Sequence, residues 1–241
     1  MSSSVVNSMR RFARRRHWRW TPSKWTLVAA GAVLVLAAAT WVVLFSRLLV
    51  AQEVSVRGAD HLGPQAVAQA ARVPAGVPLA RVDLDAVADR VAALAAVHSV
   101  RVTRRWPHTV EITVSERRPV GQLVTADGVR AIDATGAVFP LPATADRALP
   151  RLVPEPSASA GAIIEAAKVV ARLPAVLNRK VEEVHVSSRD AVTMHLRNGD
   201  QAVWGSADDS KRKARVLTAL LRHPAAVYDV TVPELPTTTG S

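Results

Sequence analysis

The chain has 241 residues, no cysteine and a formal net charge of +11. The absence of cysteine excludes disulfides, thiolate metal sites and cysteine nucleophiles, so folded parts must be stabilised by burial. The length allows one or two domains with their own hydrophobic cores.

An apolar stretch near the start, residues 25–46, contains no charged side chain. As a helix it would be about 33 Å long, enough to cross a hydrocarbon core of about 30 Å. Seven basic residues and no acidic residue precede it: Arg10, Arg11, Arg14, Arg15, Arg16, Arg19 and Lys24. Because positive charge favours the cytoplasmic side, we predict a cytoplasmic tail, 1–24, a transmembrane helix, 25–46, and export of the rest.

Tryptophans mark both ends of this predicted helix. Trp18, Trp20 and Trp25 lie at one end and Trp41 lies near the other, where amphipathic rings favour the headgroup level. We interpret all four as membrane-interface anchors. A cleaved signal peptide is the alternative, because residues 37–39 offer an A-x-A pattern, but the apolar run continues beyond them and favours an uncleaved anchor.

The basic tail lies against the expected membrane surface. There each Lys or Arg gains about 1 kcal/mol from anionic lipid. Topology and lipid contact therefore explain the charge, and we expect anionic lipids and no nucleic acid as partners of the tail.

The first exported segment shows strand and helix patterns. Residues 53–57 alternate as a half-buried strand does, and a short helix is expected over 64–72. Asp83 can cap a second helix, which we expect to run to Val97. Four apolar residues recur in it at helical spacing and are expected in the core: Leu84, Val87, Val91 and Leu94.

Two alternating strands follow, which completes the order strand, helix, helix, strand, strand. Val100 and Val102 lie on one face of the first. The second has its apolar face at Val110, Ile112 and Val114. In the connection, Arg104 and Arg105 stand beside Trp106, so they could contact an anionic partner, although a solvated turn is an equal alternative.

The pattern of the second half predicts a β-rich domain with two helices. Asp127-Gly128 and Asn198-Gly199 are hairpin signals, since both favour positive backbone angles. A helix is expected over 161–173, with three residues facing a sheet: Ile164, Ala167 and Ala171.

Towards the end, Val184 and Val186 indicate one strand, and residues 192–196 alternate along its neighbour. Ser206 is expected to cap a helix with Asp208 and Asp209 in its first turn. Its buried stripe is expected at three leucines: Leu217, Leu220 and Leu221. The last strand is expected over 226–232, where Pro233 stops it.

The usual signatures of hydrolases, transpeptidases, zinc enzymes and nucleotide-binding proteins are missing from the sequence. His185 and His195 occupy the polar face of their strands, which favours ordinary surface histidines over a metal pair. Glu182 and Glu183 point to opposite faces of one strand and so do not form a carboxylate pair. We therefore expect no enzyme, no metal and no cofactor.

Three segments resemble one bacterial family. VRVTRRWPHTVEITVSERRPV, residues 100–120, after a V-x-V-x-G strand and a capped helix, is similar to the POTRA domain of the division proteins FtsQ and DivIB. GVRAIDATGAVFP, residues 128–140, resembles the hairpin that opens that family's β domain. Residues 196–238 resemble its closing segment, especially in actinobacterial members.

The resemblance implies an α+β fold: a single transmembrane helix, a POTRA domain over 51–119, a β domain over 120–233 and a tail over 234–241. It implies a non-enzymatic scaffold of the divisome at the septal membrane, with partners of the FtsB (DivIC) and FtsL kind and indirectly a septal peptidoglycan synthase of the FtsW/FtsI kind.

The family's β domain receives its partner by strand addition at an edge, which suits the last strand here because an edge has unpaired backbone groups. The residues expected to bind are consecutive: Val227, Tyr228, Asp229, Val230, Thr231 and Val232. We expect Tyr228, Val230 and Val232 to face the core.

Two other classes of protein are alternatives. A membrane-tethered cell-wall enzyme would need a pocket with convergent ionisable groups. A POTRA-bearing envelope assembly or translocation factor would bring tandem POTRA repeats or a barrel, and the sequence contains one such unit.

Overall fold

The computed structural model describes residues 24–45, 49–146 and 148–240. By its contacts the chain divides into two compact units, residues 1–46 and 47–241. Residues 1–23 of the expected basic tail, with the anchors Trp18 and Trp20, lie outside the described residues.

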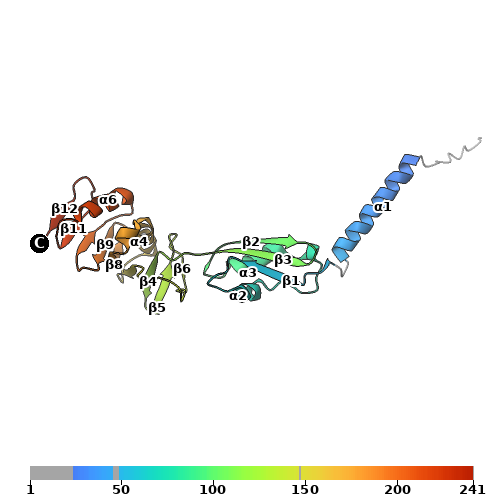
Figure 1. Cartoon of the computed structure of the whole chain (residues 1–241), viewed down its shortest axis with the longest axis horizontal. Coiled ribbons are helices and arrows are strands. Elements are labelled where there is room, and N and C mark those ends of the chain that lie inside the picture. The colour runs from blue at the N-terminus through green and yellow to red at the C-terminus, as the bar shows by residue number, and fades with distance from the viewer. Residues whose placement is uncertain (1–23, 46–48, 147, 241) are drawn as a thin grey trace, which may run out of the picture. The chain divides into compact units, whose positions relative to one another are not determined.

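The first unit contains helix α1, Lys24–Phe45, as the apolar stretch predicts (Figure 1). Among the described residues it is the one helix whose length and composition suit a membrane span. None of its residues is buried, and the Trp41 ring stacks on Phe45 with centroids 4.6 Å apart. Trp25 and Trp41 are exposed, and their role as interface anchors stays a prediction.

The second unit begins with the expected strand, helix, helix, strand, strand order (Figure 1). Its elements are β1 Glu53–Arg57, α2 Pro64–Ala71, the 3-10 turn η2 Leu79–Arg81, α3 Leu84–Ala92, β2 Val97–Arg105 and β3 Thr109–Glu116. The strands form a sheet in the order β1-β3-β2, in which β1 runs parallel and β2 antiparallel to β3.

The core of this domain confirms the predicted faces. Val110, Ile112 and Val114 of β3 are buried in one cluster with Val87 and Val91 of α3. Alternation along β3 sends these three side chains to one face, the face that packs against the helix.

The cap of α3 is confirmed, because the Ala86 N–H donates to Asp83 Oδ1 at 3.0 Å. The extension of this helix to Val97 is wrong. Val97 begins β2, and its N–H donates to Leu94 O in the turn that follows the helix.

Gly58 ends β1 for a steric reason. Its φ is +74°, and a Cβ placed there would lie 2.1 Å from Val114 O. The glycine of the V-x-V-x-G pattern therefore allows the chain to leave the sheet beside β3.

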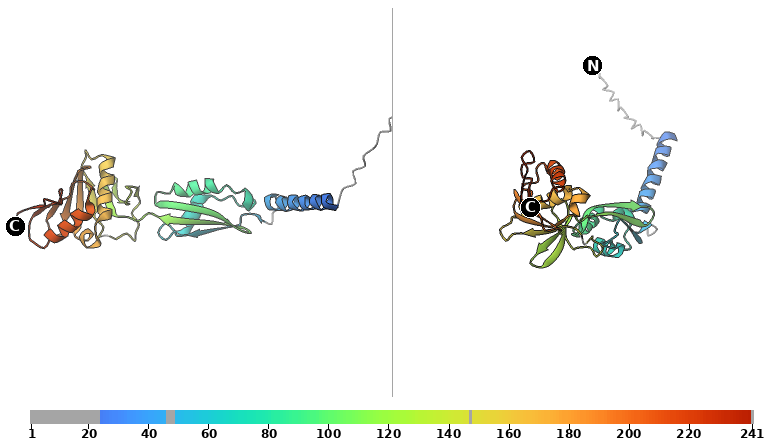
Figure 2. Two further views of the ribbon diagram at one scale, coloured as in Figure 1. Left: turned by 90° about the horizontal axis from the view of Figure 1, so that it is seen from above. Right: turned by 60° about the vertical axis from the view of Figure 1, so that its left-hand side comes forward.

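A second sheet has nine described strands in the order β12-β11-β10-β9-β8-β7-β4-β5-β6. Their bounds are β4 Gly121–Thr125, β5 Gly128–Ile132, β6 Val138–Phe139, β7 Arg151–Pro154, β8 Val181–Ser188, β9 Ala191–Leu196, β10 Gln201–Val203, β11 Val227–Asp229 and β12 Thr237–Thr239. Helices α4, Ala160–Arg172, and α6, Ser210–Leu220, cover one face (Figure 2). The short helix α5 is Ala175–Asn178.

Small residues let α4 pack closely on this sheet. Ala162, Ala166 and Ala167 are fully buried, so the predicted helix and the inward position of Ala167 are confirmed. Ala171 is exposed instead, because it lies off the buried stripe, which continues from Val169 and Val170 to Leu173. Alanine fits either face of a helix, so its spacing alone did not fix the register.

The start of α6 corrects the predicted cap. The residue before the helix is Asp209, at φ +50° and without a side-chain cap bond. Ser206 lies earlier, in the loop, where its hydroxyl contacts Asp208. Leu217 is buried as expected, and Leu220 and Leu221 are half-buried.

Both hairpin signals fall at turns, but neither forms the expected two-residue turn at the predicted positions. In the β4–β5 hairpin Gly128 already pairs with Thr125, so the turn residues are 126 and 127. Between β9 and β10 the loop is longer, since His195 pairs with Gln201.

Candidate partner-binding site

The last predicted strand is not the edge of the sheet. β11 pairs with β10 in parallel and with β12 in an antiparallel ladder. The segment expected to be a tail, 234–241, thus contributes β12, which is the outermost described strand beyond β11. The edge assigned to residues 226–232 is therefore wrong, and the open edge belongs to Thr237–Thr239.

β11 is also shorter than predicted, with three residues instead of seven. Tyr228 and Val230 face the core and are buried, as expected. Val232 is 51% exposed, which contradicts its predicted core position. The strand pattern ends at Asp229, whose carboxylate accepts from the Thr231 N–H at 2.9 Å and bends the chain.

Tyr228 fixes the start of β11. Its hydroxyl donates to His223 O at 2.9 Å and accepts from the Ala225 N–H at 3.1 Å. A buried tyrosine that satisfies its hydroxyl in this way holds the preceding loop against the sheet.

Two hydrogen bonds show which backbone groups of β11 face β10 and which face β12. The Gln201 N–H donates to Ala226 O, and the Val230 N–H donates to Val203 O. In a parallel ladder these bonds direct the polar groups of Tyr228 to β10, so those of Val227 and Asp229 face β12.

The same alternation continues on β12. Thr237 and Thr239 are opposite Asp229 and Val227, so their backbone groups face β11. Those of Thr238 point away from β11, to the open edge. Thr238 therefore offers a donor and an acceptor to an added strand.

Apolar side chains flank one end of this edge. In the loop between β11 and β12, Val232 and Leu235 are 51% and 78% exposed. The Leu235 N–H donates to Val232 O at 3.0 Å, which makes the loop a tight turn. An added strand would meet apolar contacts beside its backbone bonds.

A buried lysine supports the loop beneath this end of the sheet. Lys213 Nζ donates to Trp204 O and to Ser206 O, both at 3.0 Å. Burial lowers the pKa of Lys213, although nearby carboxylates, such as that of Asp208, partly oppose this. The lysine closes the loop from β10 to α6, a role for which its sequence context gives no signal.

Of the two arginines proposed as a surface contact, Arg104 is held within the fold. Its guanidinium donates to the carbonyl oxygens of Leu79, Ala80 and Val82. Arg105 lies 3.6 Å from Glu111 and its side chain is 60% exposed, so it keeps most of its surface.

The predicted surface histidines lie together on β8 and β9. The rings of His185 and His195 have centroids 4.4 Å apart, and His185 Nε2 lies 3.1 Å from Glu183 Oε2. Over the described ranges, no group of three or more His, Cys, Asp or Glu is placed to hold a metal ion.

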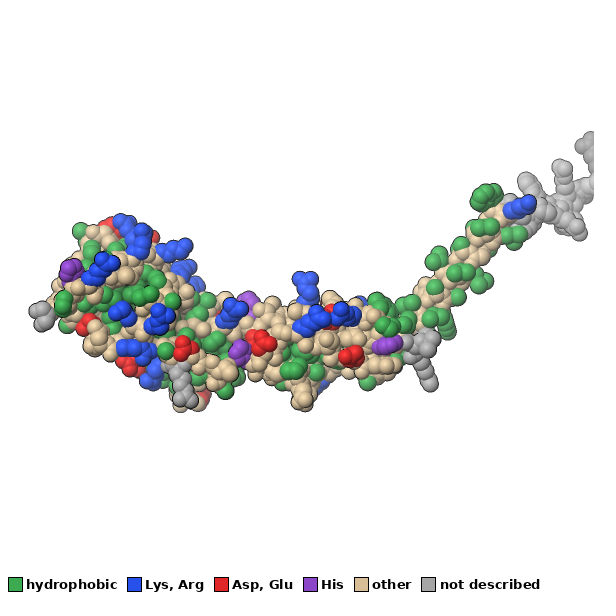
Figure 3. Space-filling view, in the orientation of Figure 1, with side chains coloured by type: hydrophobic (Ala, Val, Ile, Leu, Met, Phe, Trp, Pro, Cys, Tyr) green, Lys and Arg blue, Asp and Glu red, His purple; other side chains and the backbone are tan. Residues whose placement is uncertain are grey.

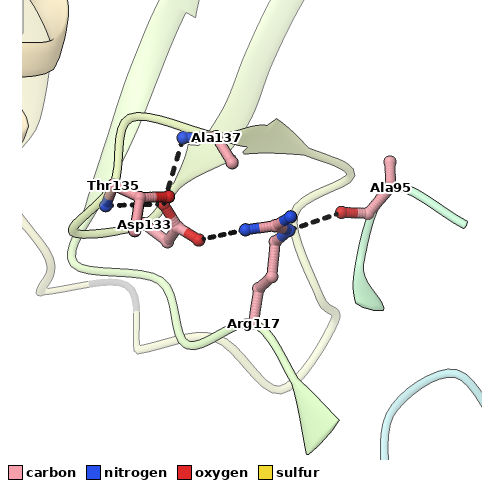
Figure 4. Close-up of polar contacts among 5 residues, drawn as sticks. All are labelled: Ala95, Arg117, Asp133, Thr135 and Ala137. Atoms are coloured by element: carbon pink, nitrogen blue, oxygen red, sulfur yellow. Dashed lines mark hydrogen bonds and ion pairs between the residues drawn. The ribbon is translucent and has the colours of Figure 1, made fainter. Parts of the chain in front are cut away.

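An arginine missed by the sequence reasoning joins the two sheets. Arg117 follows β3, and its Nε donates to Ala95 O at 3.1 Å while its Nη1 donates to Asp133 Oδ2 at 2.7 Å (Figure 4). Asp133 Oδ1 also accepts from Thr135 and from the Ala137 N–H. Burial alone would raise the pKa of Asp133, but these hydrogen bonds lower it below its ordinary value.

Two family models match the two sheets. One, described as the POTRA domain, FtsQ-type, matches residues 50–117. The other, described as cell division protein FtsQ/DivIB, C-terminal, matches residues 122–231.

Whole-chain relatives agree. Cell division protein FtsQ of Streptomyces venezuelae is 36% identical over 239 residues, which cover 95% of this chain and 88% of the relative. FtsQ of Streptomyces coelicolor is 35% identical, over 89% of this chain and 87% of that protein. FtsQ of Mycolicibacterium smegmatis is 37% identical over 88% of this chain and 64% of the longer mycolicibacterial protein.

Among solved structures, the major extracytoplasmic domain of the trans isomer of the division protein DivIB from Geobacillus stearothermophilus matches 46% of this chain and 98% of that one. The identity is 22% and the TM-score 0.34. The family models and the whole-chain relatives together establish that this chain belongs to the FtsQ/DivIB family of cell division proteins.

Proposed function

We propose that this protein is a non-enzymatic, single-pass scaffold of the divisome that binds small coiled-coil partners of the FtsB (DivIC) and FtsL kind. Through them it would coordinate a septal peptidoglycan synthase of the FtsW/FtsI kind. The observation that carries the proposal is the open edge of β12 in a chain of this family. Unpaired backbone groups on an edge bind an added strand with little demand on its side chains.

The proposed topology follows from charge. We propose a cytoplasmic N-terminus and an exported second unit at the division septum, because the six arginines before α1 and Lys24 at its start outnumber the single Arg47 close behind it. Anionic lipids would bind the basic tail. Arg105 remains the proposed contact on the first exported domain, which we place at residues 51–119. The β domain, which begins at residue 120 and extends beyond the predicted end at 233 to include β12, would carry the main interface.

Proline substitutions on β12 test the edge. Thr238→Pro removes the donor that points outwards, so the domain should fold while partner binding falls. Thr239→Pro removes a donor that faces β11 and should loosen the end of the sheet.

The measurement uses the full chain in neutral detergent, with circular dichroism for folding and titration with the exported segment of the FtsB-type partner from the same genome. If the Thr238→Pro protein is folded and binds as tightly as the parent, strand addition at β12 is wrong. An uncharged surface change on the other end of the sheet, Val138→Thr on β6, serves as the control.

A further inference from the structure

An exposed tryptophan lies in the first domain of the second unit. Trp106 is 51% exposed in the turn that joins β2 to β3, whereas Trp204 in the second domain is fully buried. Exposure alone does not indicate a binding surface, because single apolar side chains are common on protein surfaces. The place of Trp106 in the fold is what gives the exposure a meaning.

The turn that carries Trp106 lies where the chain enters the domain. The Gln52 N–H, directly before β1, donates to His108 O at 2.9 Å. A second loop lies beside the same segment, because the Ala51 N–H donates to Val77 O at 2.9 Å. The entering residues 49–52, the loop 74–78 and the turn 105–108 therefore form one end of the domain, which we call the entry end.

Few residues separate the entry end from α1. Phe45 is the last residue of α1, and Leu49 is the first described residue of the second unit. Four residues of fully extended chain span at most about 14 Å. The headgroup layer on each side of the hydrocarbon core is about 5–7 Å thick. With α1 across the membrane, the entry end is therefore confined to the neighbourhood of the lipid headgroups.

The entry end presents uncharged surface beside an aromatic ring. Residues 74–76 are exposed and carry no charge. Next to Trp106, the side chain of Arg105 is 60% exposed and lies 3.6 Å from Glu111. In the space-filling view, hydrophobic and basic side chains are both visible at this end of the domain (Figure 3). A guanidinium on such a surface can donate two hydrogen bonds to a phosphate group.

The aromatic ring should contribute more than charge at this end. Acidic residues lie here too: Glu53 begins β1, and Asp83 follows Val82, whose carbonyl oxygen accepts from Arg104. These carboxylates offset the basic side chains. The amphipathic ring of a tryptophan favours the headgroup level of a bilayer. We therefore expect the preference for a lipid surface to hold for zwitterionic phospholipids as well as for anionic ones.

We infer that the entry end of the first domain docks on the phospholipid surface beside α1, with the Trp106 ring at the headgroup level and the Arg105 guanidinium on a lipid phosphate. The inference rests on the single-pass topology of the proposed function and is independent of the protein partners. Because the tether makes the contact intramolecular, a weak interaction is sufficient. Docking would restrict the rotation of the domain about its tether.

The test uses a fluorescent label close to the docking surface. The chain has no cysteine, so Ala75→Cys can be labelled with bimane at that residue alone. The full chain is reconstituted in phosphatidylcholine vesicles that contain a small fraction of lipid with a nitroxide on its headgroup, which quenches bimane on contact. Asp60→Cys is the reference, because Asp60 is exposed beyond the far end of β1, about 17 Å along the strand. Quenching should be stronger at residue 75 than at residue 60.

Substitutions separate docking from the effect of the short tether, which keeps the label near the surface in every variant. Trp106→Ser should weaken quenching at residue 75 at least about threefold, and Trp106→Tyr, which keeps an amphipathic ring, should retain most of it. Val129→Ser is the matched control, because it removes another exposed apolar side chain, on β5, and should leave quenching unchanged.

The arginine is tested on its own strand. Arg105→Gln should weaken quenching, by less than Trp106→Ser does. Arg101→Gln removes the same charge from an exposed position farther from the turn and should leave quenching unchanged. Circular dichroism of each variant confirms that the domain is folded.

Equal quenching in folded Trp106→Ser and in the parent would overturn the inference in favour of a protein partner for the ring, since the vesicles contain no other protein. Equal weakening by Trp106→Ser and Val129→Ser would also overturn it. If Trp106→Ser leaves quenching unchanged while Thr238→Pro blocks the FtsB-type partner, the inference fails and the proposed function stands. If quenching depends on Trp106 while the Thr238→Pro protein binds that partner like the parent, the inference stands and strand addition at β12 fails.

Discussion

The two long strands of the three-stranded sheet contrast with the short strands at one end of the nine-stranded sheet. In the three-stranded sheet β2 and β3 have nine and eight residues, whereas β10, β11 and β12 have three each. A long strand with one buried face fixes its own register, because a slip of one residue would expose the whole apolar set. A short strand depends on its neighbours, and the short-stranded end is also where a further strand can add.

The largest expected effect is at the centre of the long-stranded sheet. Ile112 is fully buried against α3, so Ile112→Asp places an unpaired charge in the core and should cost about 3–5 kcal/mol of unfolding free energy. Urea unfolding of the full chain in detergent, followed by circular dichroism, measures the loss.

The neighbouring residue supplies the control. Thr113 is exposed and stands opposite Arg57 and Arg101 on the adjacent strands, so Thr113→Asp gains two basic neighbours and should change stability by less than about 1 kcal/mol. Equal losses of unfolding free energy from both substitutions would contradict the assignment of Ile112 to the core face of β3 and of Thr113 to the exposed face.

At the end of the nine-stranded sheet formed by β10, β11 and β12, stability should depend on the hydrogen bonds of Lys213 more than on the alternation of side chains along these short strands. Lys213→Ala leaves the carbonyls of Trp204 and Ser206 without their donor and opens a void, which should cost about 2–4 kcal/mol. Lys211→Ala, on the exposed face of the same helix, should cost less than about 0.5 kcal/mol. Hydrogen exchange of the β10 and β11 amides should rise only in the Lys213 variant, and unchanged exchange would contradict the assigned role.

Between the two sheets, Asp133 should make stability depend on pH. Because hydrogen bonds lower its pKa in the folded protein, it stabilises the fold above its unfolded pKa of about 3.9, and this contribution is lost as pH falls through the folded value. Asp133→Asn should cost about 2 kcal/mol at pH 7 and progressively less below pH 4.

Urea unfolding at a series of pH values tests the Asp133 prediction. Asp127→Asn in the exposed β4–β5 turn is the control and should show no such trend. A difference between Asp133→Asn and the parent that stays constant from pH 7 to pH 3 would contradict the role of the ionised carboxylate.

The sequence predicted the long-stranded sheet because its side chains carry the pattern. Val110, Ile112 and Val114 alternate with polar residues, and Asp83 stands where a cap must stand. β12 was missed because three threonines on an exposed edge show no alternation, and three residues are too few to reveal a period of two. The contact of Arg117 with Asp133 and the burial of Lys213 depend on how distant segments meet, which local pattern does not encode.

The smallest expected effects are at the starts of α3, in the first domain, and α6, in the second. Asp83 accepts the Ala86 N–H at the start of α3, so Asp83→Ala should cost about 1 kcal/mol. Ser206 lies in the loop ahead of α6 and makes no cap bond to that helix, so Ser206→Ala should cost less than about 0.5 kcal/mol. Urea titrations of both variants against the parent separate the two cases. A loss of stability in Ser206→Ala as large as that in Asp83→Ala would show that the serine caps α6 in solution. The start assigned to α6 would then have to be revised.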